Sequence, residues 1–179
     1  MNDAVMERQM AVTVREMTLG ETVLRIRYFH DASPEYLELL GVDPTRLMAP
    51  PVWEDYYRRN FSLPLEQRPS FELIWLLEDR PIGFSTADKI VFGDQAFMHL
   101  HIIDPDERAH GAGVECVRWS VEIYFDRLKL RALFCEPNAF NVAPNRTLQK
   151  AGFSYVKTHM TVPSPLNFHQ AVTRWAIKR

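Results

Sequence analysis

The pattern of hydrophobic and polar positions predicts an alternation of strands and helices along most of the chain. Short apolar runs rich in β-branched and aromatic residues are typical of strands, whereas apolar residues spaced three and four apart indicate one face of a helix. Strands are therefore expected over residues 12–17, 71–77, 82–91, 96–103, 131–135, 154–162 and 171–177. Helices are expected over residues 24–40, with a break at Ser33-Pro34, and over residues 114–128 and 143–151.

The order of these elements predicts the fold class. A strand, helices, three strands of an antiparallel meander, a helix, a strand, a helix and two closing strands indicate an α/β (α+β) mixed sheet with helices on both faces. Residues 48–70 contain several prolines beside aromatic residues, and we expect a loop there with one short helix. Residues 1–11 are interpreted as a tail and residues 12–179 as one domain, because 179 residues suffice for a single sizeable core.

Composition and charge exclude several classes of protein. The formal net charge is −2, so no basic excess argues for a nucleic-acid partner. No apolar stretch reaches the length of a membrane span and the N-terminus has no secretory pattern, so we expect a cytoplasmic protein with no membrane partner. Cys116 and Cys135 both stand in apolar surroundings and are expected to be buried, reduced thiols rather than a disulfide or a thiolate metal site.

The most informative segment joins the strand that ends at Ile102-Ile103 to the helix that begins after Gly113. Glycines at the start of a helix allow backbone N–H groups to close around an anion, and the helix dipole adds to the attraction, so a pyrophosphate is a natural ligand. A dinucleotide fold would require a small residue where Cys116 stands, and a kinase-type P-loop would require Lys-Ser/Thr where Val114-Glu115 stand. A plain glycine-containing turn is the simplest alternative.

Two patterns carry a family resemblance. The segment Arg108-Ala109-His110-Gly111-Ala112-Gly113 matches Arg/Gln-x-x-Gly-x-Gly/Ala, and this resembles the coenzyme A signature of the GNAT superfamily. Asn141, which opens the next helix, and Lys150-Ala151-Gly152-Phe153, which ends it, resemble the second signature of that superfamily. Their spacing is similar to that in ribosomal-protein N-terminal and aminoglycoside N-acetyltransferases, and the resemblance covers residues 71–160.

The resemblance implies a GNAT-like, mostly antiparallel sheet of seven strands that splays between the fourth and fifth strands. The pantetheine arm of acetyl-CoA would lie in the splay and bond to the backbone at the end of the fourth strand, while the pyrophosphate would bind N–H groups of the glycine segment. Acetyl-CoA is thus expected as a co-substrate, without a metal. The implied cofactor-binding residues are Ile102, Ile103, Arg108, Ala109, His110, Gly111, Ala112, Gly113 and Asn141.

The catalytic positions depart from the usual pattern of the family. Phe97 stands where many members have a glutamate on the fourth strand, and Leu148 stands where many have a tyrosine that protonates the leaving thiolate. Residues two apart share one face of a strand, so His99 and His101 are expected to point the same way as Phe97 unless a bulge intervenes. Both are candidates to take the amine proton, and His99 is preferred. The alternatives are ordinary buried histidines or a metal site, for which no third ligand is evident.

The function that the resemblance implies is transfer of an acetyl or other acyl group from acyl-CoA to a primary amine of a small molecule, peptide or protein, by a monomer or a homodimer. The alternative is a catalytically silent CoA-binding or regulatory domain on the same fold. Glu54 and Asp55 are candidates to attract an amine. Four aromatic residues are expected either to form a wall for an apolar or cationic part of the acceptor or to pack a helix onto the sheet, namely Trp53, Tyr56, Tyr57 and Phe61.

Overall fold

A seven-stranded mixed sheet with the order β1-β2-β3-β4-β5-β7-β6 forms the centre of the computed structural model, which describes residues 12–103 and 111–179. All neighbouring strands are antiparallel except β4 and β5, which are parallel. This arrangement confirms the mostly antiparallel α/β sheet that the sequence predicts. The strands are β1 (Val12–Glu16), β2 (Phe71–Leu77), β3 (Arg80–Val91), β4 (Gln95–Ile102), β5 (Ala132–Cys135), β6 (Ser154–Thr161) and β7 (Gln170–Lys178).

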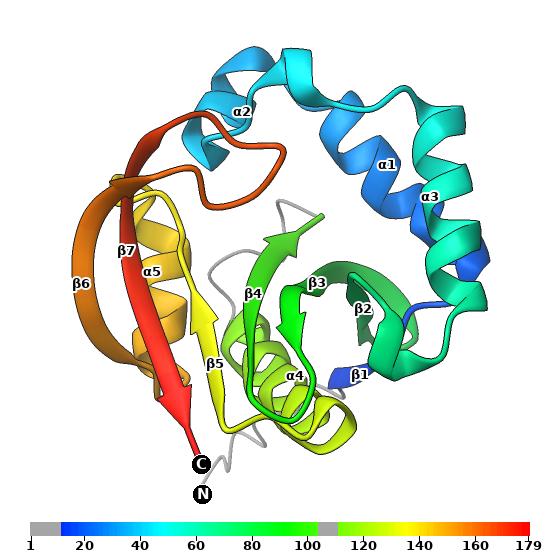
Figure 1. Ribbon diagram of the computed structural model, residues 1–179. Coiled ribbons are helices and arrows are strands. Elements are labelled where there is room, and N and C mark those ends of the chain that lie inside the picture. Colours follow the sequence, from blue (N-terminus) through cyan, green and yellow to red (C-terminus); the bar gives the residue numbers. More distant parts are fainter. Residues whose placement is uncertain (1–11, 104–110) are drawn as a thin grey trace, which may run out of the picture.

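Helices cover both faces of the sheet, as predicted (Figure 1). Three lie on one side, namely α1 (Thr22–His30), α2 (Pro34–Leu40) and α3 (Pro50–Ser62). Two lie on the other side, namely α4 (Ala112–Leu128) and α5 (Val142–Lys150). Three short 3₁₀ turns complete the described elements, at Leu19–Glu21, Pro44–Arg46 and Leu65–Gln67. Among the residues that the structure describes, none of the helices has both the length and the hydropathy that crossing a membrane requires.

The break between α1 and α2 follows from local sequence chemistry. The Ser33 hydroxyl accepts a hydrogen bond from the backbone N–H of Tyr36 at 3.2 Å, and Pro34 occupies the first turn, where its missing N–H costs little. Gly41 ends α2 with φ +71°, and a Cβ there would lie only 1.9 Å from the Gln170 side-chain oxygen. Only glycine fits this position, and through it the end of α2 contacts the start of β7.

The segment over residues 48–70 differs from the prediction. The expected loop with one short helix is instead the 13-residue α3, followed by a 3₁₀ turn. Pro50 and Pro51 fall in the first turn of α3, so they begin the helix rather than interrupt it. Trp53 is 1% exposed and Tyr57 is fully buried, which shows that α3 is held to the sheet by its aromatic face.

Two hydrophobic cores lie on opposite sides of the sheet because side chains alternate along each strand. The core toward α4 contains Trp75, Met98 and Val121. The core toward α1 and α3 contains Phe29 and Phe84. On β4 this alternation directs even-numbered residues toward α4 and odd-numbered residues toward α1.

The predicted splay lies between β4 and β5. Their parallel pairing runs only from Gln95 opposite Ala132 to Met98 opposite Cys135. Residues 99–102 of β4 continue the ladder with β3 alone. Figure 1 shows the two strands diverging beyond this point, so that among the described residues no strand pairs with that side of β4.

Candidate active site

A cavity of about 1090 Å³ opens where β4 and β5 separate. Its wall is formed by the first turn of α4 and by α5, by the end of β4, and by α1, α2 and α3. The cavity therefore connects the glycine segment to the aromatic helices on the opposite face of the sheet. Its lining includes Gly111, Gly113, Asn141, Arg146, His99, His101, Arg25 and Trp53.

The first turn of α4 brings several of the predicted cofactor-binding residues to this wall. Gly111 is the N-cap with φ +85°, a conformation that favours glycine, and Gly113 lies within the first turn. Backbone N–H groups in the first turn of a helix have no intrahelical acceptor, so they are donors for a ligand in the cavity. Ala112 begins the helix and is buried. The remaining predicted residues of this segment, Arg108, Ala109 and His110, lie outside the described residues.

Two basic residues of α5 line the cavity together with these glycines, namely Arg146 and Lys150. The sequence analysis did not assign them a role, although their spacing of four residues places them on one face of the helix. They add positive charge to a wall that already presents the N-terminal turn of α4. An anionic chain of phosphates fits this end of the cavity.

The end of β4 presents alternate backbone groups to the splay. The N–H of Ile103 donates to the carbonyl of Ile82 at 2.8 Å, so Ile103 directs its backbone toward β3. Backbone groups alternate in direction along a strand, so Ile102 and Leu100 direct theirs toward the splay. Both residues line the cavity. Of the two isoleucines predicted to contact a cofactor, Ile102 lines the cavity, whereas Ile103 donates its N–H to the carbonyl of Ile82.

Asn141 occupies the N-cap position of α5, as the sequence predicts, and lines the cavity. Its side chain forms no capping hydrogen bond. The segment is held instead by Asn145, whose amide donates to the carbonyls of Asn141 at 2.7 Å and Asn138 at 3.0 Å. The Asn141 amide is therefore not needed to start the helix.

His99 and His101 share one face of β4 with Phe97, as expected. The β3–β4 register is continuous from Gly83 opposite Ile102 to Asp88 opposite Phe97, so no bulge turns either histidine away. Both histidines line the cavity. Phe97 packs against Phe134, with the ring centroids 5.3 Å apart.

His99 has an acidic partner that the sequence analysis missed. Asp88 stands on β3 diagonally across from His99, and its Oδ1 lies 3.0 Å from His99 Nε2. Each side chain is 20% exposed. Burial acts to raise the pKa of Asp88, but the adjacent His99 outweighs it and holds that pKa below its ordinary value. Asp88 is thus an ionised carboxylate within ion-pair distance of the His99 ring.

His101 lies in different surroundings. Its ring contacts those of Phe84, Tyr28 and Phe29 at centroid distances of 4.9, 5.1 and 5.2 Å, and its Nδ1 lies 3.2 Å from the Tyr28 hydroxyl. Burial, followed by the positive charges of Arg25 and His99, lowers the pKa of His101 well below its ordinary value. At neutral pH His101 is therefore uncharged and a weak proton acceptor.

The aromatic residues of α3 surround a cation of the protein itself. The guanidinium carbon of Arg25 lies 5.5 to 6.0 Å from the ring centroids of Phe29, Trp53, Tyr57 and Phe84. A signal for this was present in the sequence, since Arg25 stands four residues before Phe29 on the apolar face of the first helix. The wall predicted for a cationic acceptor is thus partly an internal cation–π cage.

The other predicted features near the acceptor have structural explanations. Glu54 and Asp55 are exposed on α3 and pair with Arg58 at 3.7 and 2.6 Å. Leu148 is fully buried.

Burial raises the pKa of the Cys116 thiol to about 12, and both cysteines are unpaired and buried, as predicted. Within residues 12–103 and 111–179, no group of three or more His, Cys, Asp or Glu side chains has an arrangement suited to a metal ion.

Comparisons with known proteins agree with this geometry. The acetyltransferase (GNAT) family model matches residues 29–153. No curated protein sequence is similar enough to match the chain. Three solved structures with coenzyme A illustrate the similarity in fold, and at 14 to 17% identity they establish the fold alone.

The first is RimL, a ribosomal L7/L12 α-N-protein acetyltransferase, with a TM-score of 0.72 and 14% identity over 93% of each chain. The second is spermidine N-acetyltransferase from Vibrio cholerae, with a TM-score of 0.73 and 15% identity over 93% of this chain and 95% of that chain. The third is aminoglycoside acetyltransferase AAC(6')-Ib, with a TM-score of 0.66 and 17% identity over 94% and 95% of the two chains.

Proposed function

The chain belongs to the acetyltransferase (GNAT) family, and we propose that it transfers an acetyl group from acetyl-CoA to an amine bound between β4 and the helices α1 and α3. The observation that carries the proposal is the continuous cavity at the β4–β5 splay, which connects the first turn of α4 to His99. Such a cavity allows an extended cofactor to reach from a phosphate site to a reacting centre.

The cofactor end of the proposal rests on backbone groups and positive charge. The pyrophosphate binds the first turn of α4 at Gly111, Ala112 and Gly113, beside Arg146 and Lys150 of α5. For Arg108, Ala109 and His110 the support is the sequence signature, because they lie outside the described residues. The pantetheine arm lies in the splay beside Ile102, where it bonds to the backbone of Leu100 and to the Asn141 amide.

We assign His99 as the general base. An ammonium group has no lone pair, so the acceptor must lose a proton before or during its attack on the thioester carbonyl. His99 Nε2 faces Asp88, which leaves Nδ1 as the nitrogen that takes this proton. The new bond joins the amine nitrogen to the acetyl carbon, the carbon–sulfur bond breaks, and coenzyme A leaves as a thiolate. The nitrogen then loses its second proton, which passes to the thiolate directly or through water, and His99 returns the first proton to the solvent.

His101 has a supporting role in this account. Its uncharged ring packs between Phe84 and Phe29 and bonds to the Tyr28 hydroxyl, so it shapes the acceptor wall without exchanging a proton. The paired His99 and Asp88 also argue against a catalytically silent domain, because they supply a base where the usual glutamate is replaced by Phe97.

The proposal is tested by following the release of coenzyme A thiol from acetyl-CoA in the presence of a panel of primary amines. We expect turnover with at least one class of amine and formation of the corresponding amide, detected by mass. Saturable binding of acetyl-CoA without amide formation from polyamines, aminoglycosides, amino acids or peptide N-termini would contradict the proposed transfer and support a silent CoA-binding domain.

A further inference from the structure

Arg25 is a cation in the wall of the proposed acceptor site. It lies on α1, lines the cavity, and is enclosed by the aromatic rings of Phe29, Trp53, Tyr57 and Phe84. Burial acts to lower its pKa, but Tyr57 and Glu72 outweigh burial and raise that pKa above its ordinary value. The guanidinium is therefore charged at neutral pH.

This charge has no acidic partner among the residues that the structure describes. The hydrogen bond that Arg25 donates there goes from Nη1 to the Tyr57 hydroxyl. Its Nε is buried and has no hydrogen-bond acceptor within residues 12–103 and 111–179. A buried charge without a counter-ion is costly, so an unpaired guanidinium at a cavity wall indicates a place for an anion.

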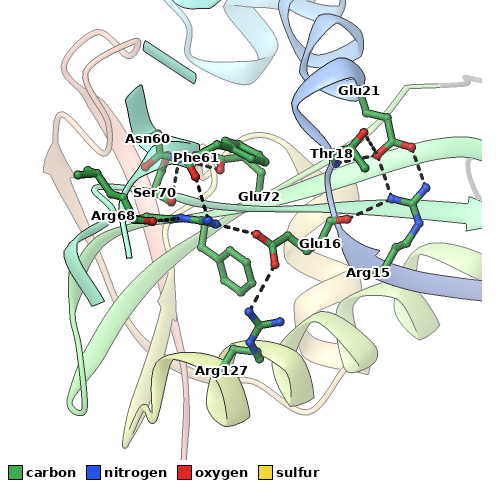
Figure 2. A network of polar contacts seen from close by, with 12 residues as sticks. Arg15, Glu16, Thr18, Glu21, Asn60, Phe61, Arg68, Ser70, Glu72 and Arg127 are labelled. Carbon is green, nitrogen blue, oxygen red and sulfur yellow. Dashed lines mark hydrogen bonds and ion pairs between the residues drawn. The ribbon is translucent and has the colours of Figure 1, made fainter. Parts of the chain in front are cut away.

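The charge of Glu72 acts on Arg25, but the Glu72 carboxylate is hydrogen-bonded to other residues. Figure 2 shows its carboxylate beside Asn60 and Ser70, and Asn60 Nδ2 donates to it at 3.2 Å while the Ser70 hydroxyl donates to its other oxygen. Burial raises the pKa of Glu72, and the residue is not part of the cavity lining. Glu72 moderates the charge of Arg25 through space, and within residues 12–103 and 111–179 no carboxylate forms an ion pair with the guanidinium.

Two further residues extend the polar character of this wall. Thr86 on β3 stands opposite His99 and lines the cavity, and its buried hydroxyl has no hydrogen-bond partner among the described residues. Lys89 also lines the cavity, and its ammonium donates to the Pro163 carbonyl at 2.6 Å. The Asp88 carboxylate in the same lining lies 3.0 Å from His99, so it faces the proposed base.

We infer that the acceptor carries an anionic group as well as its amine, and that Arg25 binds this group while the amine faces His99. The inference rests on the proposed function, because it names the substrate class of the same site. Phe84 contacts both Arg25 and His101 in the aromatic cluster, and His101 shares its strand face with His99, so the anion site and the base belong to the same wall of the cavity. Carboxylate and phosphate both match the fork of a guanidinium, and amino acids and aminoalkyl phosphates are the corresponding acceptors.

Matched pairs of acceptors test the inference. Amino acids are compared with their amides, and aminoalkyl phosphates with the corresponding amino alcohols, in the thiol-release assay. We expect kcat/KM to be about 10- to 100-fold higher for the anionic member of at least one pair, the usual effect of hydrogen bonds to a charged group. The pair that shows the preference distinguishes a carboxylate from a phosphate. Equal rates for both members of every pair would overturn the inference and leave the proposed function intact.

The variant Arg25→Gln tests whether this residue causes the preference. It should lower kcat/KM by about 10- to 100-fold for the anionic acceptor and leave the neutral member almost unchanged, with the loss mainly in KM. Arg25→Lys keeps the positive charge but lacks the planar guanidinium, so its kcat/KM for the anionic acceptor should lie between those of the native protein and Arg25→Gln. This variant replaces Arg25→Gln in the test if the glutamine variant does not fold. Arg27→Gln is the matched control, because Arg27 is exposed on the same helix and is not part of the cavity lining. If Arg25→Gln lowers kcat/KM equally for both members, Arg25 is structural and the inference is wrong.

A binding measurement separates this inference from the proposed transfer. Anionic amines should raise the melting temperature of the protein saturated with coenzyme A, and Arg25→Gln should abolish the rise. If no acceptor is acetylated and this rise is still observed, the transfer is refuted while the anion site stands. If anionic and neutral amines raise the melting temperature equally in both proteins, the anion site is refuted.

Discussion

His99 and His101 stand two residues apart on β4 yet differ in chemistry because their surroundings differ. An ionised carboxylate lies 3.0 Å from His99, whereas aromatic rings enclose His101. Burial lowers the pKa of His101 well below its ordinary value, so our proposal gives the role of base to His99 and not to His101.

The assignment of the base predicts a change in the pH profile. His99→Ala should lower turnover by about 10²- to 10⁴-fold at neutral pH, the usual contribution of general base catalysis, with acetyl-CoA affinity almost unchanged. Turnover of the native protein should rise with pH as the imidazole loses its proton, and this limb should be absent in the variant. His169→Ala is the control, because His169 is exposed and is not part of the cavity lining. A native rate and pH profile in His99→Ala would show that another group takes the proton.

Asp88→Asn tests the partner of that base. Turnover should fall by about tenfold or more, because the His99 ring loses the group that orients it, while acetyl-CoA affinity should stay almost unchanged. A native rate in Asp88→Asn would contradict the role given to Asp88.

Single residues also show how far the sequence specified the site. The shared face of His99 and His101 was predictable from strand periodicity, and the structure confirms it. The pairing of His99 with Asp88 depended on the β3–β4 register, which one sequence does not reveal. The position of Arg25 within an aromatic cluster depended on how α1 and α3 pack against β3, so its role was not predictable from the helix pattern alone.

At the scale of elements, short sequence motifs determine where most of the helices begin and end. Ser33-Pro34 and Gly41 delimit α2, and the glycine segment begins α4, as predicted. The prediction over residues 48–70 was wrong because proline was treated as a helix breaker, although in the first turn of α3 it is compatible with the helix. The length of α3 was determined by burial of Trp53 and Tyr57 against the sheet, a tertiary effect that local propensity does not report.

The start of α4 provides a test of the cofactor site. At Gly111 any side chain would strain the backbone, since φ is +85°, so Gly113 is the better position. A Cβ at Gly113 would meet Ile102 Cδ1 at an ordinary distance of 3.7 Å. Gly113→Glu should fold well, because an acid suits the first turn of a helix, but should weaken acetyl-CoA binding by about tenfold or more through repulsion of the pyrophosphate.

Gly113→Gln is the matched control for this charge, because glutamine has nearly the same size and is uncharged. Calorimetric titration should show weaker loss of affinity in the glutamine variant than in the glutamate variant. Equal affinities in the two variants would mean that the phosphates do not bind at the start of α4.

The packing of α3 yields a prediction about stability. Trp53→Ala should lower the free energy of unfolding by about 3 to 5 kcal/mol, since it removes a large buried side chain that also covers Arg25. Val52→Ala, at an exposed position of the same helix, should change it by less than about 0.5 kcal/mol. Denaturant unfolding measures both variants, and similar values for the two would contradict the buried role of α3.

At the scale of the whole molecule, the cavity joins two sites that belong to different faces of the sheet. The splay between β4 and β5 provides the passage, and the two hydrophobic cores hold the helices that form its ends. The fold class and the cofactor signature followed from the order of elements and from two motifs. The cavity could not be predicted from the sequence, because it depends on where the parallel pairing of β4 and β5 stops.

Binding of a cofactor to the folded state alone stabilises the whole molecule. Acetyl-CoA at a hundredfold excess over its dissociation constant should raise the free energy of unfolding by about 2.7 kcal/mol. Adenosine, which lacks the pantetheine arm and the phosphates, should have a much smaller effect at the same concentration. If acetyl-CoA produces no rise in melting temperature at millimolar concentration, the chain does not bind this cofactor.

A crystal structure of the protein with coenzyme A tests the central claim most directly. The account predicts the pyrophosphate at the first turn of α4, the pantetheine arm between β4 and β5 beside Leu100 and Ile102, and the sulfur in the part of the cavity that His99 lines. A complex in which coenzyme A lies outside the β4–β5 splay, or in which its sulfur is remote from His99, would contradict the account.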